Sequence, residues 1–275
     1  MMTDPKIVAP IFIIGCHRSG TSIFYRKLAL HPDLAFITRT TRRAPNQIWL
    51  MRLFMLLRSK EKNHTPIGGE VWNRFGSGDD QVMTAANVTP EIREYFERLV
   101  KNHLILFKRK RFLNKSPSNS VKIGFLDALF PDAHFIHMVR DGRAVARSIS
   151  KGRMSHGRFS GAKYPGWQDL LDKPVVASCG LQWTQTIAYI QNALKQIPDE
   201  RILQVRYEDF ISRPVETMQR VGERCHLKWT DPLLEQVAEG LRSRNYKWSE
   251  SFSPSDIERL QNLQGDLLAE LGYEV

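Results

Sequence analysis

At 275 residues the chain is long enough for one large domain with a substantial core, and its 42% hydrophobic and 25% charged residues are typical of a soluble globular protein. Lys and Arg outnumber Asp and Glu by 40 to 29, and the resulting charge of +11 favours an anionic partner, with plain solubility as the alternative. Three widely spaced cysteines exclude a disulfide framework and a CxxC metal site. Since no signal-peptide pattern and no apolar run of membrane-spanning length is present, we expect a cytoplasmic protein that makes at most peripheral membrane contact.

The first predicted elements are a strand, a glycine-bearing loop and a helix. The apolar run 10–14 is rich in β-branched residues and ends at Gly15, which is typical of a buried parallel strand. A helix is predicted from about residue 21 to residue 30, because Pro32 then stops it. A second, short strand is predicted over 34–37.

Two predicted helices and a long loop follow. The stretch 44–59 is apolar around most of its circumference, so we expect a buried helix, the alternative being a lid or an acceptor-binding surface. Residues 60–88 lack periodicity and are predicted to form a long loop. A helix then begins at Thr89-Pro90, an N-cap followed by proline at the first helical position. His103 falls on its apolar stripe, which favours a core histidine over a catalytic one.

The rest of the chain repeats a strand followed by a helix. This alternation predicts an α/β fold of three layers, with a mainly parallel central sheet covered by helices on both faces. The remaining predicted strands are 112–113, 134–139 and 202–207, and the remaining predicted helices run to about 130, to about 151, over 175–197, from about 214 and over 255–271.

Open parallel sheets bind ligands beyond the carboxyl ends of their strands. The residues at those positions are mostly basic or rich in backbone donors, so we expect an anion-binding crevice. They are Gly15 to Ser22, Asn114-Lys115, Arg140 to Arg143, and Tyr207.

The first of these loops has the glycine spacing of a Walker A loop. Gly15 and Gly20 stand five positions apart, and the backbone N–H groups of such a loop hold phosphate at a helix N-terminus. Thr21 occupies the position of the Walker lysine, and the cation is Arg18 inside the loop. Because that lysine reaches the β- and γ-phosphates, its replacement disfavours ATP or GTP hydrolysis. A tight turn without a ligand is the alternative.

These residues resemble the sulfotransferases that use 3′-phosphoadenylyl sulfate (PAPS). Residues 18–22, followed by a helix and His31-Pro32, resemble the family's 5′-phosphosulfate-binding loop, and residues 130–148 resemble its 3′-phosphate-binding strand and helix. Asn114 to Pro117 is similar to the lysine-bearing strand end of tyrosylprotein sulfotransferases, and Arg206 to Asp209 also matches a family segment. The resemblance extends over nearly the whole chain and implies a P-loop NTPase-like fold.

The resemblance also implies roles for individual residues. Arg18 and Lys115 would be the catalytic cations, without a metal, and the product would be adenosine 3′,5′-bisphosphate (PAP). For Ser148 an ordinary helix serine is the alternative, and the match at residues 244–247 is loose. The implied donor-binding residues are Arg18, Ser19, Gly20, Thr21 and Ser22 for the 5′-phosphosulfate, Arg140 and Ser148 for the 3′-phosphate, Tyr207 near the adenosine, and Asn245 and Lys247 near the 3′-phosphate.

The family pattern breaks at the general base. In tyrosylprotein sulfotransferases a glutamate lies eight residues after the His-Pro histidine, and counting from His31 gives Arg39, which cannot accept a proton at neutral pH. We expect Glu70 to be the base, because it lies beside two glycines and near Trp72 and Phe75, which could form an acceptor wall. A solvated loop carboxylate is the alternative, and the histidines are weaker candidates.

The sequence therefore predicts a single sulfotransferase domain over 1–275, with a helical and loop insertion over about 40–110 and a loop over 152–174 that shape the acceptor site. It would move a sulfuryl group from PAPS to a hydroxyl, less readily an amine, of a small-molecule, lipid or glycan acceptor. The alternatives are a P-loop-type phosphotransferase or nucleotide-binding protein without sulfuryl transfer, and an inactive relative. Nucleic acid is not expected as a partner, because no basic stripe with interleaved aromatic residues is present.

Overall fold

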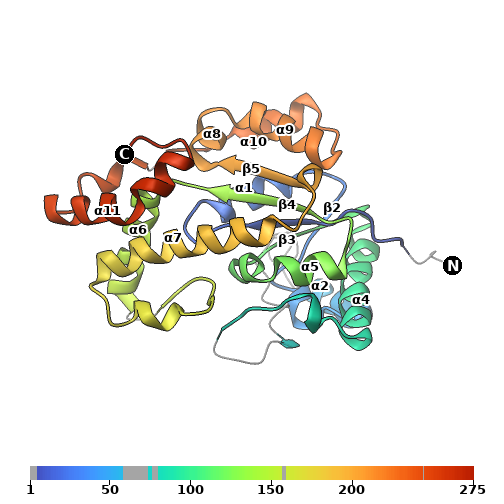
Figure 1. Cartoon of the computed structure of the whole chain (residues 1–275). Helices are drawn as coiled ribbons and strands as arrows, with labels where there is room; N and C mark the ends of the chain where they lie inside the picture. Colours follow the sequence, from blue (N-terminus) through green and yellow to red (C-terminus); the bar gives the residue numbers. More distant parts are fainter. Residues whose placement is uncertain (1–4, 58–73, 76–79, 157–158, 244) are drawn as a thin grey trace.

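The computed structural model describes residues 5–57, 74–75, 80–156, 159–243 and 245–275. Within these ranges, five strands form one parallel sheet in the order β2-β3-β1-β4-β5 (Figure 1). The central strand β1 is buried along its whole length and pairs with β3 on one side and β4 on the other. The predicted mainly parallel sheet is confirmed, and all of its pairs in the described residues are parallel. The strands are β1 (Ile11–Ile14), β2 (Leu34–Ala35), β3 (Arg111–Lys115), β4 (His134–Val139) and β5 (Ile202–Arg206).

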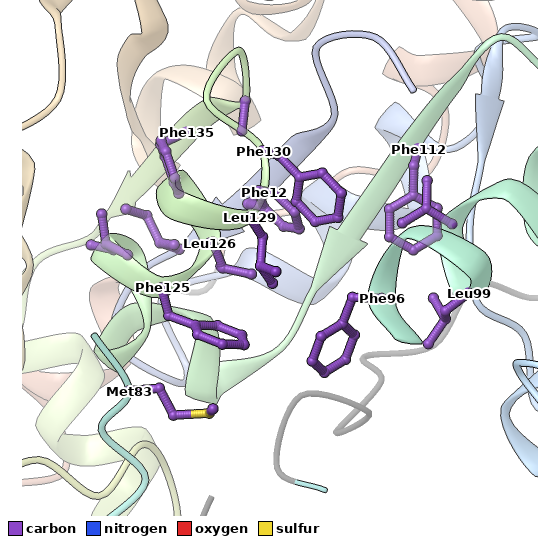
Figure 2. Packing of buried hydrophobic residues seen from close by; sticks show 14 of the residues in the cluster. Phe12, Met83, Phe96, Leu99, Phe112, Phe125, Leu126, Leu129, Phe130 and Phe135 are labelled. Atoms are coloured by element: carbon purple, nitrogen blue, oxygen red, sulfur yellow. The ribbon is translucent and has the colours of Figure 1, made fainter. Parts of the chain in front are cut away.

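Helices cover both faces of this sheet, which confirms the predicted three layers. In Figure 1, α8, α9 and α10 lie on one side of the sheet, while α4, α5 and α7 lie on the other. Successive residues of β1 point to opposite layers. Phe12 belongs to a buried cluster with residues of α4, α5 and α7, part of which Figure 2 shows, and its ring lies near those of Phe130 and Phe135. Ile13 belongs to a second cluster, with residues of α1, α9 and α10. The helices are α1 (Thr21–Leu28), α2 (Ile48–Leu56), α4 (Pro90–Phe107), α5 (Ile123–Leu129), α6 (Gly142–His156), α7 (Val175–Leu194), α8 (Tyr207–Ser212), α9 (Pro214–Cys225), α10 (Asp231–Ala238) and α11 (Pro254–Glu270).

Helix α4 starts and packs as its sequence predicts. The Thr89 hydroxyl accepts a hydrogen bond from the amide of Ile92 at 3.3 Å, and Pro90 is the first helical residue. His103 is fully buried; its Nδ1 donates to the carbonyl of Leu99 at 2.7 Å, and its Nε2 accepts from the hydroxyl of Thr41 at 3.0 Å. Burial lowers the pKa of His103 to about 4. His103 is therefore a neutral core residue.

The prediction of a buried helix over 44–59 is wrong. Helix α2 spans only Ile48–Leu56, and of its residues Met51 alone is fully buried. Trp49 is 64% exposed and Leu56 is 84% exposed. The physical reason is that α2 packs on α4 and on the preceding turn Thr41–Arg43 without being enclosed, so Trp49 and Leu56 stay exposed. The predicted loop 60–88 lies largely outside the described residues.

Two further segments differ from the prediction. Pro117–Val121 forms a 3₁₀ turn before α5 where a continuous helix was expected, and α8, α9 and α10 lie between β5 and α11 where one helix was expected. None of the helices within the described ranges has the length and apolar character that crossing a membrane requires.

Candidate functional site

A cavity of about 740 Å³ opens at the carboxyl edge of the sheet, between α1, α6 and the segment after α10. Its lining includes residues from three of the four predicted strand-end segments, those that follow β1, β4 and β5. The segment at the end of β3 does not line it. None of the residues that line it in the described part of the chain is Asp or Glu. Seven are cationic, which gives the cavity a positively charged lining that is suited to an anion. The cations are Arg18, Arg26, Arg140, Arg147, Lys151, Arg242 and Lys247.

The loop between β1 and α1 requires glycine at both of its ends. Gly15 has φ +147°, and a Cβ there would lie 2.4 Å from the carbonyl oxygen of Met138 on β4. Gly20 has φ +85°, and a Cβ there would lie 2.3 Å from Cδ2 of Tyr207. The loop is therefore pressed between the ends of β4 and β5, which only glycine allows.

The same loop presents backbone donors to the cavity. Ser19 N–H donates to the carbonyl of Cys16 at 3.2 Å and closes the turn. Within the described residues, the amides of Gly20, Thr21 and Ser22 have no acceptor, as expected at the start of a helix. The buried hydroxyl of Ser19 also has no partner there, although buried hydroxyls usually have one. Donors without acceptors at a helix N-terminus fit a phosphate or sulfate group.

Arg18 joins this loop to the residues after β4. Its Nε donates to the Ser148 hydroxyl on α6 at 2.9 Å, and its carbonyl oxygen accepts from Nη1 of Arg140 at 3.0 Å. The structure thus brings Arg18 together with two predicted donor-binding residues that lie more than 120 positions after it in the chain.

The Arg140 guanidinium is held on three sides. Its Cζ lies 4.3 Å from the centre of the Tyr207 ring, and its Nε donates to Oδ1 of Asn245 at 3.0 Å. Among the described residues Nη2 has no acceptor. Burial lowers the pKa of Arg140, although a guanidinium remains charged at neutral pH. A fixed, half-stacked guanidinium that faces a cavity is suited to a phosphate group.

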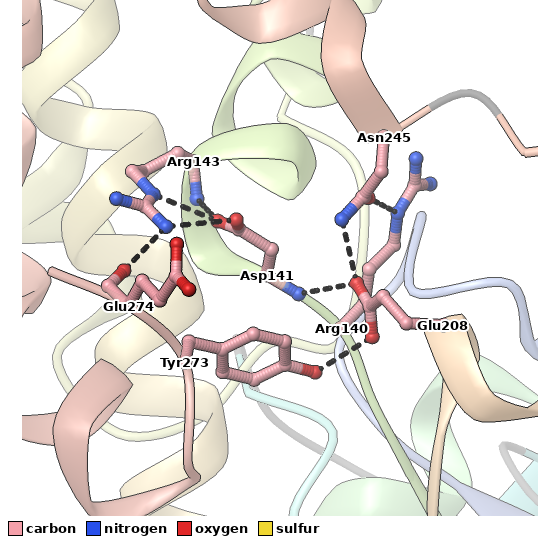
Figure 3. A network of polar contacts seen from close by, with 7 residues as sticks. All are labelled: Arg140, Asp141, Arg143, Glu208, Asn245, Tyr273 and Glu274. Atoms are coloured by element: carbon pink, nitrogen blue, oxygen red, sulfur yellow. Dashed lines mark hydrogen bonds and ion pairs between the residues drawn. The ribbon is translucent and has the colours of Figure 1, made fainter.

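Glu208 supports the position of Arg140 indirectly, through Asn245 (Figure 3). Its Oε1 accepts from Nδ2 of Asn245 at 2.8 Å and from the amide of Asp141 at 3.2 Å, and its Oε2 accepts from the Tyr273 hydroxyl at 2.9 Å. The carboxylate therefore fixes Asn245, which in turn holds Arg140. The sequence analysis missed the roles of Glu208 and Tyr273.

Lys115 approaches the loop from the opposite side, at the end of β3. Its Nζ donates to the Ser22 hydroxyl at 2.9 Å. Burial, and secondarily the charge of Arg26, lowers the pKa of Lys115. The two predicted catalytic cations thus flank the N-terminus of α1, Arg18 within the loop and Lys115 beside it.

Helix α6 contributes more to the cavity than Ser148. Arg147 and Lys151 line it together with Ala144 and Ser148, and this spacing places all four on one face of α6. Arg26 lines it from α1, four residues after Ser22. The sequence analysis missed these three cations, although helical spacing from the predicted Ser148 and Ser22 could have found them. Lys247, one of the predicted donor-binding residues, lines the same cavity.

The predicted base cannot be placed, because Glu70 and Trp72 lie outside the described residues. Arg39 is exposed. The alternative His31 is buried, its Nδ1 accepts from the amide of Asp33 and its Nε2 donates to the carbonyl of Lys228 at 3.1 Å, so both of its nitrogens are occupied. The three cysteines are free and buried, and burial raises the pKa of Cys16 to about 12, which excludes that thiol as a nucleophile at neutral pH.

The predicted loop 152–174 belongs to α6 at its start and packs on the domain at its end. Ala162, Tyr164 and Leu170 are buried against Val121, and the Ser160 hydroxyl lies 3.0 Å from Nε2 of His17. The segment 152–174 therefore contacts the glycine-bearing loop Gly15 to Ser22 directly, through His17.

Comparison with known proteins identifies a matching family. A model of the sulfotransferase family matches residues 10–231. Protein-tyrosine sulfotransferase A of Caenorhabditis elegans is 25% identical over 224 residues, which cover 82% of this chain and 51% of that protein. Omega-hydroxy-beta-dihydromenaquinone-9 sulfotransferase Stf3 of Mycobacterium tuberculosis is 26% identical over 306 aligned positions, which cover 100% of this chain and 76% of that protein. The chain spans about half the length of the first of these relatives.

Two solved structures share the fold. Sulfotransferase STF9 from Mycobacterium avium has a TM-score of 0.64 at 18% identity, covering 99% of this chain and 79% of that one. Mouse sulfotransferase SULT7A1, solved in complex with PAP, has a TM-score of 0.53 at 12% identity, covering 96% of this chain and 85% of that one.

Proposed function

Because the chain belongs to the sulfotransferase family, we propose that it transfers a sulfuryl group from PAPS to a hydroxyl of an acceptor and releases PAP. The observation that carries this proposal is the presence of two anion-binding sets on one cavity: the α1 amides with Arg18, and Arg140 with its support. PAPS has a phosphosulfate at its 5′ position and a separate phosphate at its 3′ position. ATP and GTP have no 3′-phosphate, so neither would place an anion against Arg140.

The residues present fit this donor. The orphaned amides of Gly20, Thr21 and Ser22 and the unpartnered Ser19 hydroxyl offer donors for the phosphosulfate. Arg140, stacked on Tyr207, would hold the 3′-phosphate, and Tyr207 would lie near the adenosine. Ser148, Asn245 and Lys247 would complete the 3′-phosphate site. The PAP bound to mouse SULT7A1, which has the same fold, supports the donor class.

The reaction needs little covalent chemistry from the protein. PAPS supplies the sulfuryl group, and its nucleotide phosphate is the leaving group of an in-line displacement by the acceptor oxygen. Arg18 and Lys115 would stabilise the negative charge that develops during transfer, because both are cations held beside the N-terminus of α1. We propose that these cations make a metal unnecessary. The described residues contain no cluster of three or more His, Cys, Asp or Glu that could hold one.

The acceptor is proposed by its chemical class. The two relatives described above are named for a protein tyrosine and for a hydroxylated menaquinone. We propose a small-molecule, lipid or glycan alcohol as the acceptor, with Glu70 as the base that takes its proton, in a cytoplasmic location.

The decisive measurement compares PAP with adenosine 5′-monophosphate, which lacks only the 3′-phosphate. At one hundred times its Kd, PAP should stabilise the protein by about 2.7 kcal/mol, which raises Tm by about 5–11 °C in a chain of this size. The monophosphate, ATP and GTP at the same concentration should have a much smaller effect. In Arg140→Ala the response to PAP should fall to that of the monophosphate.

An equal response to PAP and ATP would refute the proposed donor and favour the phosphotransferase alternative. Binding of PAP without PAP release from PAPS in the presence of lipid, phenol and sugar alcohols would instead favour an inactive relative.

A further inference from the structure

Helix α2 exposes an apolar face that the proposed function does not use. Its exposed apolar residues recur at intervals of three and four, so they lie on one face of the helix. The opposite face packs on α4, where Met51 is fully buried. The exposed apolar residues of α2 and its C-cap are Trp49, Leu53, Leu56 and Leu57, which are 64%, 43%, 84% and 74% exposed.

The same face is cationic. Arg52 is exposed and lies three residues after Trp49 and four before Leu56, which places it within the apolar stripe. Three more arginines, Arg39, Arg42 and Arg43, are exposed in the segment that precedes the helix. From residue 39 to residue 57 the sequence contains four arginines and no Asp, Glu or Lys.

This combination distinguishes between the occupants that the face could have. A second copy of the chain would pair the face with itself, since the common twofold interface is self-complementary, and would bring two faces of like positive charge together. A protein partner would need a groove of its own that carries acidic side chains. A bilayer with anionic lipids matches both properties at once, because its headgroups attract arginine while its interface accepts tryptophan and leucine.

We propose that the exposed face of α2, formed by Trp49, Arg52, Leu53, Leu56 and Leu57, docks the protein on an anionic membrane surface. Leucine side chains enter the acyl boundary, and Arg52 reaches the headgroups by extending its side chain. A docked chain meets acceptors that are dissolved in the bilayer at high local concentration. That consequence rests on the proposed function, whereas the docking itself does not.

The test is sedimentation of the full chain with vesicles of phosphatidylcholine, with and without phosphatidylglycerol. The protein should bind the anionic vesicles at least tenfold more tightly than the neutral ones, and added salt should weaken binding. Leu53→Glu combined with Leu56→Glu should reduce binding to anionic vesicles at least tenfold, and Arg52→Gln should reduce it by about fivefold.

Leu171→Glu is the matched control, because Leu171 is a leucine that is 52% exposed on another segment. It should leave vesicle binding unchanged, and all variants should keep the Tm of the parent because the substituted side chains are exposed. Absence of binding to anionic vesicles, or equal losses in the α2 variants and Leu171→Glu, would overturn the proposal. So would light scattering that shows a dimer in solution which the double variant dissociates. None of these readouts requires PAPS, so they are independent of the proposed donor.

Discussion

Replacement of Gly20 by alanine should destabilise the protein through two separable effects. Gly20 has φ +85° and ψ 2°, and an alanine in this left-handed region costs about 1–2 kcal/mol. In addition, its Cβ would lie 2.3 Å from Cδ2 and 2.8 Å from Cε2 of Tyr207, and overpacking of this kind costs about 1–3 kcal/mol. The variant should therefore lose roughly 2–5 kcal/mol of unfolding free energy, which is a Tm decrease of about 4–20 °C.

Two further variants separate the effects. Gly240 is also left-handed, with φ +68°, but a Cβ there meets no atom within 4 Å, so Gly240→Ala should cost only the backbone contribution of about 1–2 kcal/mol. In a Tyr207→Ala background, Gly20→Ala should likewise cost only about 1–2 kcal/mol, because the ring that it strikes is gone.

The measurement is urea unfolding of the parent, both single variants of the Gly20–Tyr207 pair and the double variant. We expect a coupling free energy of about 1–3 kcal/mol between the two positions. If the two single losses add to the double loss within about 0.5 kcal/mol, the close approach of the loop to Tyr207 is refuted. The proposed position of the adenosine near Tyr207 would then lose its support.

Three more predictions follow from the site and the core. Lys115→Met should lower kcat at least about 100-fold and change PAP affinity little, and an equal loss in PAP affinity would assign Lys115 to donor binding instead of catalysis. Tyr273→Phe removes the hydroxyl that donates to Glu208, so by the usual value of a bond to a charged group it should lose about 1.5–3 kcal/mol of stability. It should also weaken PAP binding while leaving adenosine 5′-monophosphate binding unchanged, and calorimetric titration that finds both ligands weakened equally would contradict the positioning role. Burial lowers the pKa of both His103 and His137 to about 4 from an ordinary 6.5, so the unfolded chain binds protons first as the pH falls. Each of these two histidines should therefore lower the free energy of unfolding by roughly 2 kcal/mol at pH 5 relative to pH 7. A Tm that is the same at both pH values would contradict the burial of neutral histidines.

The elements that sequence predicted well are those whose patterns are local. The strand at Ile11–Ile14 is an uninterrupted apolar run, and the start of α4 is marked by a capping threonine followed by a proline. The carboxyl ends of parallel strands converge by topology, so the closeness of Arg18 to Arg140 followed once the strands were assigned.

The elements that sequence missed depend on contacts between distant segments. Apolar composition alone could not show that the packing of α2 leaves one of its faces exposed, and this is why its expected burial was wrong. Glu208 and Tyr273 are 65 positions apart, and no periodicity links them. The helical face of Arg147 and Lys151 could have been predicted, because it follows from Ser148 by spacing alone.

The residues that line the cavity restrict which groups could act as the general base. None of the described residues that line it carries a carboxylate. His17, which lies within the loop, has its pKa lowered to about 3, by burial first and by the charges of Arg18 and Arg153 next. A group with so low a pKa is a poor acceptor for the proton of an alcohol at neutral pH. The described residues that line the cavity thus offer no good base, and Glu70, which lies outside the described residues, stays the predicted base.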